Sequence, residues 1–535
     1  MRSICEMLVD LVAIRSDTGT PTECGAAKRI FELLMEDPYF QENPDMCGMY
    51  DKGDCFGRPV VWGLKKGSTG RTVILTGHYD AVETSCYGVF EPLSLSPEPL
   101  RNAMLESGSF SGEVLKDLQD DNWMFGRGAA DMKAGIAINL HMLRNYEFGE
   151  KGILFTAVCD EENLSAGARQ AIGLYEELKE KHGLDYVYAA ITEPLGTKQV
   201  GNGVPVPLLD GATGKILPVV VVKGKLAHSA YVMNGLNSAL ILAEIIRGVD
   251  LNTDFLSNSM GICNQPGSTQ IFFDMKKDYD VSIPEYSAAG FNLTYYADTD
   301  PMEQLKKLEK VCLDACDTVV ERYNKVFDQM TAANQIDPSY RVEYYPQVMT
   351  LAQLKEMLAD KPGFAQKDKS LQAEAEEKIR SGELTMQKAG IGYIRALMDL
   401  AELTAPAVVV GVVPPFYPTV TNQRLSKSIQ PMLERTSKAL ESEGIPITVR
   451  PYSQGMNDTS YMSCANPASA MVIMDNMAIS KDIYSIDFAA LARLNIPTQL
   501  VGPAARNVHQ MAERVYLPDV EETIPRVLQE LIKQA

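Results

Sequence analysis

The sequence predicts an α/β protein whose main sheet is covered by helices on both faces and whose chain is interrupted by a smaller inserted domain. In the first 212 residues, short apolar runs alternate with helical patterns, an order typical of such a sheet. The next stretch has the order strand, helix, strand, strand, helix, strand, which is typical of a ferredoxin-like α+β motif. The α/β pattern returns toward the C-terminus, so we expect the main domain to be built from both ends of the chain.

The first region, 1–212, is assigned to the first part of the main domain. Amphipathic helical patterns occupy 4–14 and 26–35, and an apolar helix is expected over 135–143. Short, continuous apolar runs indicate buried strands, and these are predicted at 71–77, 152–158 and 184–191.

The second region, 213–350, is assigned to the inserted domain, and 351–402 to a helical insertion. The helix expected over 301–330 has a start signal in the Asp298-Thr-Asp300 segment. A second helix is expected over 237–249. The predicted strands are 217–222, 269–273, 289–296 and 341–348. The insertion is predicted to be helical because it is charged and rich in Lys, Glu, Ala and Leu.

The last region, 403–535, is assigned to the second part of the main domain. Strands are predicted at 407–413, 447–450 and 498–501. Helices are predicted at 423–443 and 519–533. The strand at 407–413 is a continuous apolar run, and we interpret it as the point where the main α/β pattern resumes.

Composition narrows the class of protein. Of 535 residues, 45% are hydrophobic and 22% are charged, as in ordinary globular proteins. Acidic residues outnumber basic ones by 70 to 50, giving a net charge of -20, which disfavours nucleic acid and favours cations as partners. The 10 cysteines form no CxxC pair, which is typical of reduced thiols. Charged residues interrupt the N-terminus and no long apolar stretch occurs, so we expect a cytoplasmic protein without membrane contact.

The end of the first predicted strand carries residues suited to a metal site. His78 and Asp80 are two apart in Thr76-Gly-His-Tyr-Asp80, so in extended backbone their side chains point to the same side. A carboxylate in that position can accept the second ring N–H of a metal-binding imidazole. Alone this pair is weak evidence, since a histidine at a strand end is commonly a packed structural residue.

Further metal-ligand side chains are spread along the chain, most of them at predicted strand ends. They are Asp131, Glu161, Glu162, Glu193 and His509. Taken singly they have ordinary explanations, such as a helix-capping aspartate or a solvated acidic loop. Taken together they are expected at one edge of the sheet, where ligands of α/β proteins bind. Two histidines with several carboxylates suit a pair of zinc-like ions.

The order of these motifs resembles a known family. HxD, GRGxxDMKxG, DEE, EP and a late GPxxxxxH follow one another as in the di-zinc aminoacylases, carboxypeptidases and succinyl-diaminopimelate desuccinylases. The resemblance implies a zinc-exopeptidase-like, three-layer α/β/α catalytic domain with an inserted ferredoxin-like lid. The long chain and its helical insertion resemble the arginine-utilisation (RocB-type) branch of that family.

The resemblance also implies a ligand set for two zinc ions per chain, with cobalt or manganese as alternatives. Asp131 would bridge both ions. His78 and Glu193 would complete one site, and Glu162 and His509 the other.

The remaining roles near the metals are carried over in the same way. Asp80 would orient His78, and Glu161 would be the general base. Chemistry alone does not separate Glu161 from Glu162 as the base, and only the motif order of the family decides it.

Residues outside the metal motifs are assigned to substrate. By resemblance, His228 in the lid would stabilise the tetrahedral oxyanion of a partner subunit, in a homodimer formed through the lid; the alternative is a surface histidine. Asn237 and Asp458 would line the pocket. The segment 291–296 has no arginine for a substrate carboxylate, so Arg506 is a candidate substitute, with a structural salt bridge as the alternative.

These residues predict a metal-dependent hydrolase that cleaves an amide bond of a small peptide or N-acyl amino acid. A place in arginine or other amino-acid catabolism follows from the resemblance. One alternative is a catalytically silent family member that binds a ligand or a partner. A second alternative is a non-hydrolytic metal enzyme, such as an isomerase or lyase of a diamino acid.

Overall fold

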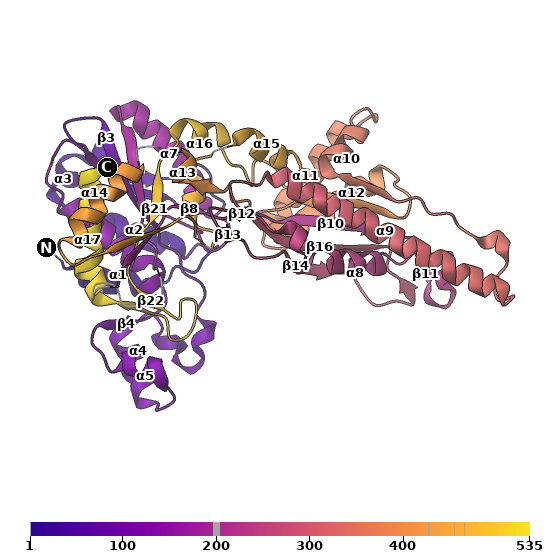
Figure 1. Ribbon diagram of the computed structural model, residues 1–535, viewed down its shortest axis with the longest axis horizontal. Coiled ribbons are helices and arrows are strands. Elements are labelled where there is room, and N and C mark those ends of the chain that lie inside the picture. The colour runs from indigo at the N-terminus through magenta and orange to yellow at the C-terminus, as the bar shows by residue number, and fades with distance from the viewer. Residues whose placement is uncertain (1, 196–203, 426–428, 454, 465) are drawn as a thin grey trace. The chain divides into compact units, whose positions relative to one another are not determined.

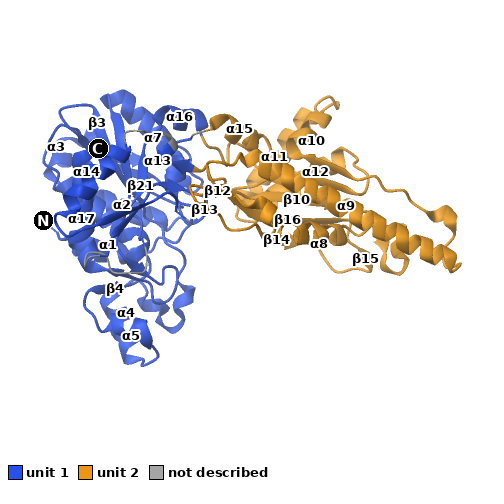
Figure 2. Cartoon of the chain, in the orientation of Figure 1, with its two compact units in different colours: residues 1–212, 420–465, 487–535 blue, residues 213–419, 466–486 orange. Residues whose placement is uncertain are grey.

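A computed structural model describes residues 2–195, 204–425, 429–453, 455–464 and 466–535 (Figure 1). The chain divides into two compact units (Figure 2). The first comprises 1–212, 420–465 and 487–535, and the second comprises 213–419 and 466–486. No helix in the described part of the chain is long and apolar enough to cross a membrane.

The first unit is built on an eight-stranded mixed sheet. Its strands, in spatial order, are β1 (Cys47–Tyr50), β2 (Val60–Lys65), β5 (Gly152–Val158), β3 (Arg71–His78), β6 (Asp185–Ile191), β21 (Thr498–Leu500), β7 (Val206–Leu209) and β20 (Ile447–Arg450). The central strands β5, β3, β6 and β21 are parallel to one another, whereas β1 and β2 are antiparallel additions. The central strands are buried along nearly their whole length, which explains their continuous apolar sequence.

Helices cover both faces of this sheet. They are α1 (Ile4–Val12), α2 (Glu23–Met35), α3 (Pro38–Glu42), α4 (Pro97–Glu106), α5 (Gly112–Leu118), α6 (Ala134–Arg144), α7 (Ala166–His182), α13 (Asn422–Leu425), α14 (Ile429–Glu441), α16 (Phe488–Leu494) and α17 (Ile524–Gln534). Ile153 and Phe155 of β5 join the core that includes α1, α2, α6 and α17. Thr156 points to the opposite face, where its hydroxyl is 3.0 Å from that of Tyr175 in α7. The predicted three-layer α/β/α architecture is therefore confirmed.

Short strands complete the first unit. Strands β22 (Ala505–Arg506), β23 (Arg514–Tyr516) and β4 (Trp123–Phe125) form a small antiparallel sheet, and β8 (Gly211–Ala212) pairs with β19 (Val420–Thr421). The helix predicted over 423–443 corresponds to α13 and α14, and its part at 426–428 lies outside the described residues.

The second unit is built on a separate sheet with the order β14 (Ser268–Phe273), β16 (Tyr286–Tyr295), β10 (Pro218–Lys223), β18 (Ala407–Val412) and β17 (Gln347–Thr350). Strand β9 (Gly214–Ile216) extends it by pairing with β16. Two further pairs are β11 (Ala227–His228) with β15 (Ser282–Ile283), and β12 (Asn258–Ser259) with β13 (Ile262–Cys263).

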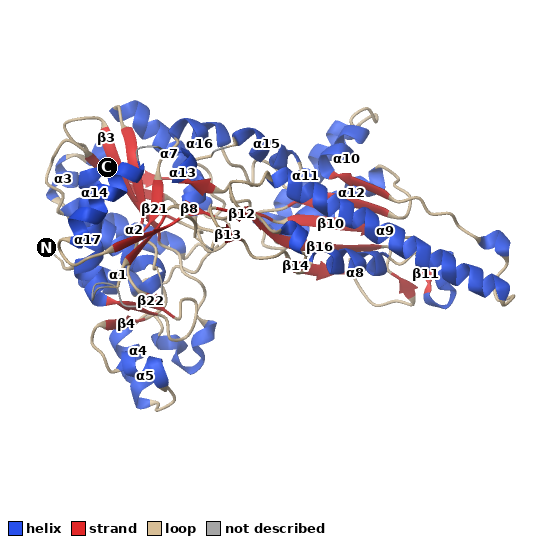
Figure 3. Ribbon diagram, in the orientation of Figure 1, coloured by secondary structure: helices blue, strands red, loops and turns tan. Residues whose placement is uncertain are grey.

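Helices cover both faces of this second sheet as well. Helices α8 (Ser238–Val249) and α9 (Pro301–Ala332) lie on one face, where the Ser238 hydroxyl is 2.7 Å from that of Ser287 in β16 (Figure 3). Helices α10 (Leu351–Leu358) and α12 (Met386–Leu400) pack against Val219 and Val221 on the other face. Helix α11 (Phe364–Arg380) lies against α12, and α15 (Pro467–Asp475) against α9. The 351–402 insertion is therefore the layer that closes the open face of a ferredoxin-like sheet.

The assignment of region 403–535 to the main domain is wrong in two places. The strand expected at 407–413 was assigned to the main domain, but β18 lies in the second unit between β10 and β17. It pairs antiparallel with β10 and parallel with β17, and every residue in it is buried. Because a continuous apolar run fits the middle of either sheet, its sequence does not reveal which sheet it joins. The segment 466–486 likewise belongs to the second unit.

Asp210 fastens three segments of the first unit. Its Oδ1 accepts hydrogen bonds from the side-chain amides of Asn422, at 2.8 Å, and Gln499, at 3.1 Å, while its Oδ2 is buried without a hydrogen bond. Burial raises the pKa of Asp210 from 3.8 to about 6, although both amides oppose the shift.

We therefore expect Asp210→Asn to change how stability depends on pH. Since folding raises this pKa, the protonated carboxyl stabilises the folded state below pH 4, and this contribution is lost as the pH rises through 6. The variant has no such loss, so its free energy of unfolding relative to the wild type should rise by about 2 kcal/mol between pH 4 and pH 7. Urea titrations at several pH values measure this. A difference that stays constant with pH contradicts the assignment.

Candidate metal centre

Parallel pairing brings the predicted ligands to one edge of the first sheet. His78 at the end of β3 lies opposite Val158 of β5, and Thr76 lies opposite Ile191 of β6. The acidic segment 160–162 and Glu193 follow these two strands directly, so they meet His78 at the carboxyl edge.

Asp131 stands between two imidazoles. Its Oδ1 is 3.0 Å from Nε2 of His78, and its Oδ2 is 3.2 Å from Nε2 of His509. Glu162 Oε1 is 2.7 Å from the same His509 nitrogen, and Glu193 Oε1 is 3.9 Å from Nε2 of His78. One oxygen of Asp131 thus faces His78 and Glu193, and the other faces His509 and Glu162.

Asp80 connects His78 to the acidic segment. The Nδ1 of His78 is 3.0 Å from the backbone oxygen of Asp80 and 3.4 Å from its carboxylate. The same carboxylate accepts hydrogen bonds from the backbone N–H groups of Glu161, at 3.1 Å, and Glu162, at 3.3 Å. Asp80 therefore holds an imidazole and the acidic loop in a common arrangement.

Among the residues that the structure describes, two groups have the composition and spacing to hold a metal ion. They are His78 with Asp131 and Glu162, and His78 with Glu161 and Glu193, and the ligand atoms of each group lie within 4.8 Å of one another. Imidazole and carboxylate donors of this kind suit zinc and related divalent ions.

The carboxylates repel one another strongly. Burial raises the pKa of Glu161 well above its usual range, and the charge of Glu193 raises it further. Burial and Asp131 do the same to the pKa of Glu193, whose Oε1 is buried without a hydrogen bond. Burial would lower the pKa of His78, but the charge of Asp80 and the hydrogen bond with Asp131 raise it well above 6.5. Cations are the natural partners of such a cluster.

A buried ionic network holds the acidic segment in place, and no pattern in the sequence indicates it. Arg58 Nη1 donates to Glu23 Oε1 at 2.7 Å and to Asp160 Oδ1 at 2.9 Å, and its Nη2 donates to Asp54 at 2.8 Å. Glu23 also accepts from the backbone N–H of Asp160 at 2.9 Å. These contacts join α2, the start of β2 and the acidic loop, which are far apart in sequence.

A second network ties the loops of Asp131 and His509 together. The buried Arg127 guanidinium donates to the carboxylate of Glu513 and, at 3.3 Å, to the backbone oxygen of His509. Glu513 Oε1 accepts from the backbone N–H groups of Ala130, at 3.3 Å, and Asp131, at 3.4 Å. Arg127 belongs to the GRG motif that we noted, but its partner could be found only in the structure.

The structure places Arg506 in a salt bridge. Its Nη1 donates to Asp117 Oδ2 at 2.6 Å, and its guanidinium lies 4.7 Å from the centre of the Trp123 ring. The structural alternative for Arg506 is therefore the one observed. Arg514 shares Asp117 and the same ring.

His228 and Asn237 belong to the second unit. His228 is exposed, and its Nδ1 accepts from the backbone N–H of Ala230 at 3.0 Å. Asn237 caps α8, with its side-chain oxygen accepting from the N–H of Ala239 at 2.9 Å. Their roles toward a substrate stay predictions. Asp458, in contrast, is buried in the first unit, and its charge helps to raise the pKa values of Glu161 and Glu193.

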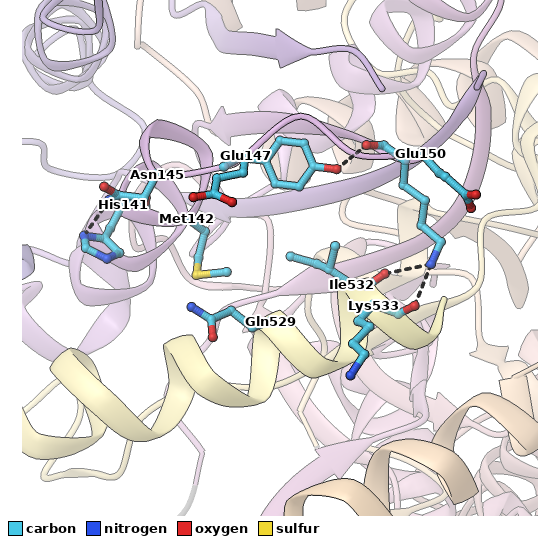
Figure 4. Close-up of a pocket in the computed structure, with 10 residues that line it drawn as sticks. His141, Met142, Asn145, Glu147, Glu150, Gln529, Ile532 and Lys533 are labelled. Carbon is cyan, nitrogen blue, oxygen red and sulfur yellow. Dashed lines mark hydrogen bonds between the residues drawn. The ribbon is translucent and has the colours of Figure 1, made fainter. Parts of the chain in front are cut away.

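A surface cavity of about 480 Å³ lies elsewhere on the first unit (Figure 4). His141, Met142, Gln529, Ile532 and Lys533 contribute to its lining, which comes from α6, α17 and the loop after α6. Within this lining, Lys151 Nζ donates to the backbone oxygens of Ile532, at 3.1 Å, and Lys533, at 2.7 Å. None of the candidate ligands lines this cavity.

We expect Arg58→Met to destabilise the first unit strongly. The change leaves the buried carboxylates of Glu23 and Asp160 without their cation, and the loss of one partner of a buried pair costs about 3–5 kcal/mol. Urea denaturation measures the free energy of unfolding. Arg15→Met is the matched control, because its pair with Asp17 is exposed and worth about 0–1 kcal/mol. Equal losses in the two variants would contradict the role of the network.

Comparisons with known proteins agree with this arrangement. The chain is 28% identical to the uncharacterized protein YqjN of Bacillus subtilis, over 98% of this chain and 94% of the relative. It is 25% identical to Protein RocB of the same organism, over 98% and 93%. The solved structure of aminopeptidase PepT from Bacillus cereus has the same fold, with a TM-score of 0.55 and 12% identity over 99% of this chain and 98% of that one. The model of peptidase family M20/M25/M40 matches residues 74–534, and the chain therefore belongs to that family.

Proposed function

We propose that the protein is a metal-dependent hydrolase that cleaves an amide bond of a small peptide or an N-acyl amino acid. The observation that carries the proposal is the carboxylate of Asp131, which faces His78 with one oxygen and His509 with the other. Membership of a peptidase family supports hydrolysis as the reaction.

The residues present fit two divalent metal ions, which we propose to be zinc. Asp131 would contact both ions, His78 and Glu193 would hold one, and Glu162 and His509 the other. The buried Glu193 Oε1, which has no hydrogen bond, supports this fit because it is an acceptor left open beside His78. Bound there, the two ions would activate a water molecule and polarise the carbonyl group of the scissile amide.

Glu161 is the residue proposed to move the proton. Its carboxylate would accept a proton from the attacking water and deliver it to the leaving nitrogen. Two features support this role. The backbone N–H of Glu161 is held by Asp80, which fixes the residue beside His78. Burial raises the pKa of its carboxylate, so its affinity for a proton is increased.

The proposal also includes a metabolic role and a dimeric assembly. Full-length similarity to RocB supports a place in arginine or other amino-acid catabolism, in the branch that the sequence resembles. We propose that His228 stabilises the oxyanion in the active site of a partner subunit, within a cytoplasmic homodimer formed through the second unit.

Metal analysis tests the centre directly. Protein purified without chelator and reloaded with zinc should contain about two zinc ions per chain by elemental analysis. The variant that carries both His78→Ala and Asp131→Ala should lose them, whereas His141→Ala, away from the centre, should keep them. A folded protein that binds no metal after reloading contradicts the hydrolase and favours a binding protein.

Glu161→Gln should separate catalysis from metal binding. The variant keeps a side chain of the same shape but cannot take up the proton, so kcat should fall by about 10²–10⁴-fold on any amide that the wild type hydrolyses. Its zinc content should remain at the wild-type value. Unchanged kcat would assign the proton transfer to another residue.

If the imidazole of His228 stabilises the oxyanion, His228→Ala should lower kcat by about 10²–10³-fold. The zinc content should stay the same. The exposed Val232→Ala provides a neighbouring control in the same segment. Full activity of the His228 variant on a confirmed substrate would contradict the oxyanion role, and sedimentation analysis checks the dimer separately.

A further inference from the structure

A short segment of the first unit has buried polar groups without partners. It spans 457–463 and includes the single-turn helix η7 (Asp458–Tyr461). Four of its side-chain oxygens are buried and make no hydrogen bond: Asp458 Oδ1, Thr459 Oγ1, Ser460 Oγ and Ser463 Oγ. Asp458 is 3% exposed, and the other three are fully buried. We call this set the 457–463 acceptor site.

These oxygens are not used to hold the backbone of their own segment. Asn457 caps the turn by accepting from the N–H of Thr459 at 3.0 Å, and the N–H of Ile496 donates to the backbone oxygen of Met462 at 3.0 Å. The segment is thus kept in place by other groups. Because buried polar atoms in folded proteins almost always have partners, four unpartnered oxygens within six residues make this segment a candidate ligand site.

The acceptor site lies beside the candidate metal centre. Asp458 hydrogen-bonds with Ser165, the residue that precedes α7 and closely follows the acidic segment 160–162. Its charge acts on both Glu161 and Glu193. The segment also contacts α7 and β21 within the first unit. These contacts place the acceptor site on the side of the first unit that carries the candidate metal centre.

The four oxygens of the acceptor site favour a cationic ligand. One carboxylate and three hydroxyls can together accept several hydrogen bonds from N–H donors. An anionic group would be repelled by Asp458 and by the neighbouring glutamates. A desolvated carboxylate that accepts from a charged donor forms a strong, charge-assisted hydrogen bond.

We propose that the 457–463 acceptor site binds the cationic end of a basic substrate side chain, an ammonium or a guanidinium, with Asp458 as its counter-ion. This inference rests on the proposed function, because it names the class of amide that the enzyme would take. It distinguishes a substrate with a basic side chain from one with a neutral side chain of the same shape.

Calorimetric titration of the zinc-loaded, full-length protein tests the site without turnover. L-arginine is compared with L-citrulline, and L-lysine with L-norleucine, since the members of each pair are similar in size and differ in charge. We expect at least one cationic member to bind tenfold or more tightly than its neutral counterpart. The identity of that pair distinguishes guanidinium from ammonium.

Substitutions locate the preference. Asp458→Asn should abolish the preference for the cationic ligand, because it weakens binding of that ligand and leaves binding of the neutral one unchanged. Thr459→Val should reduce the preference several-fold. Asp121→Asn, which changes a carboxylate that is 95% exposed, should preserve it. Zinc content and thermal unfolding confirm that the variants are folded. If Asp458→Asn does not fold, the Thr459→Val result decides the question.

The proposal is overturned if the two members of each pair bind equally. It is also overturned if the preference for the cation survives Asp458→Asn. Where that variant does not fold, a preference that survives Thr459→Val overturns it. Hydrolysis of the corresponding Nα-acetyl amino acids is measured separately. Turnover without charge preference would reject the acceptor site and keep the hydrolase. Asp458-dependent binding of the cation with no turnover of any amide would reject the hydrolase and keep the site.

Discussion

The contact between one carboxylate and two imidazoles is the constraint on which the rest of the first unit depends. Asp131 meets His78 from β3 and His509 from the far end of the chain, and both contacts are close to 3 Å. His78 and Asp131 are 53 residues apart, and His509 lies more than 370 residues beyond Asp131, so three separate segments must meet at one point. The parallel core of the sheet delivers His78, and the pair of Arg127 and Glu513 holds the other two loops in register.

Electrostatics explains why so many acidic groups can be buried at this edge. Each acidic loop has a fixed guanidinium behind it, Arg58 for the segment 160–162 and Arg127 for the Asp131 loop. Both arginines are almost fully buried, so their charge is little screened by water. The remaining carboxylates of the cluster have no such guanidinium among the contacts described here, and cations are their natural partners.

Much of this arrangement could be predicted from the sequence, for a physical reason. The strands that carry His78 and precede Glu161 and Glu193 are continuous apolar runs, and in a parallel sheet the residues after such runs share one edge. The partners of Arg58 could not be predicted, since a salt bridge between distant segments leaves no local pattern. The orphaned oxygens of Thr459 and Ser463 were also hidden, because burial of a hydroxyl is a tertiary property. Strand β18 was misplaced because a run of valines suits the centre of any sheet.

The position of β18 also governs where this protein can be divided. It is the only described strand that pairs with β17, and it covers one edge of β10. A fragment that ended at residue 350 would expose the whole edge of β10 and leave β17 without a neighbour. Exposed, flat, valine-rich edges recruit other chains, so such a fragment would aggregate, whereas one extending to 419 would carry its own edge protection.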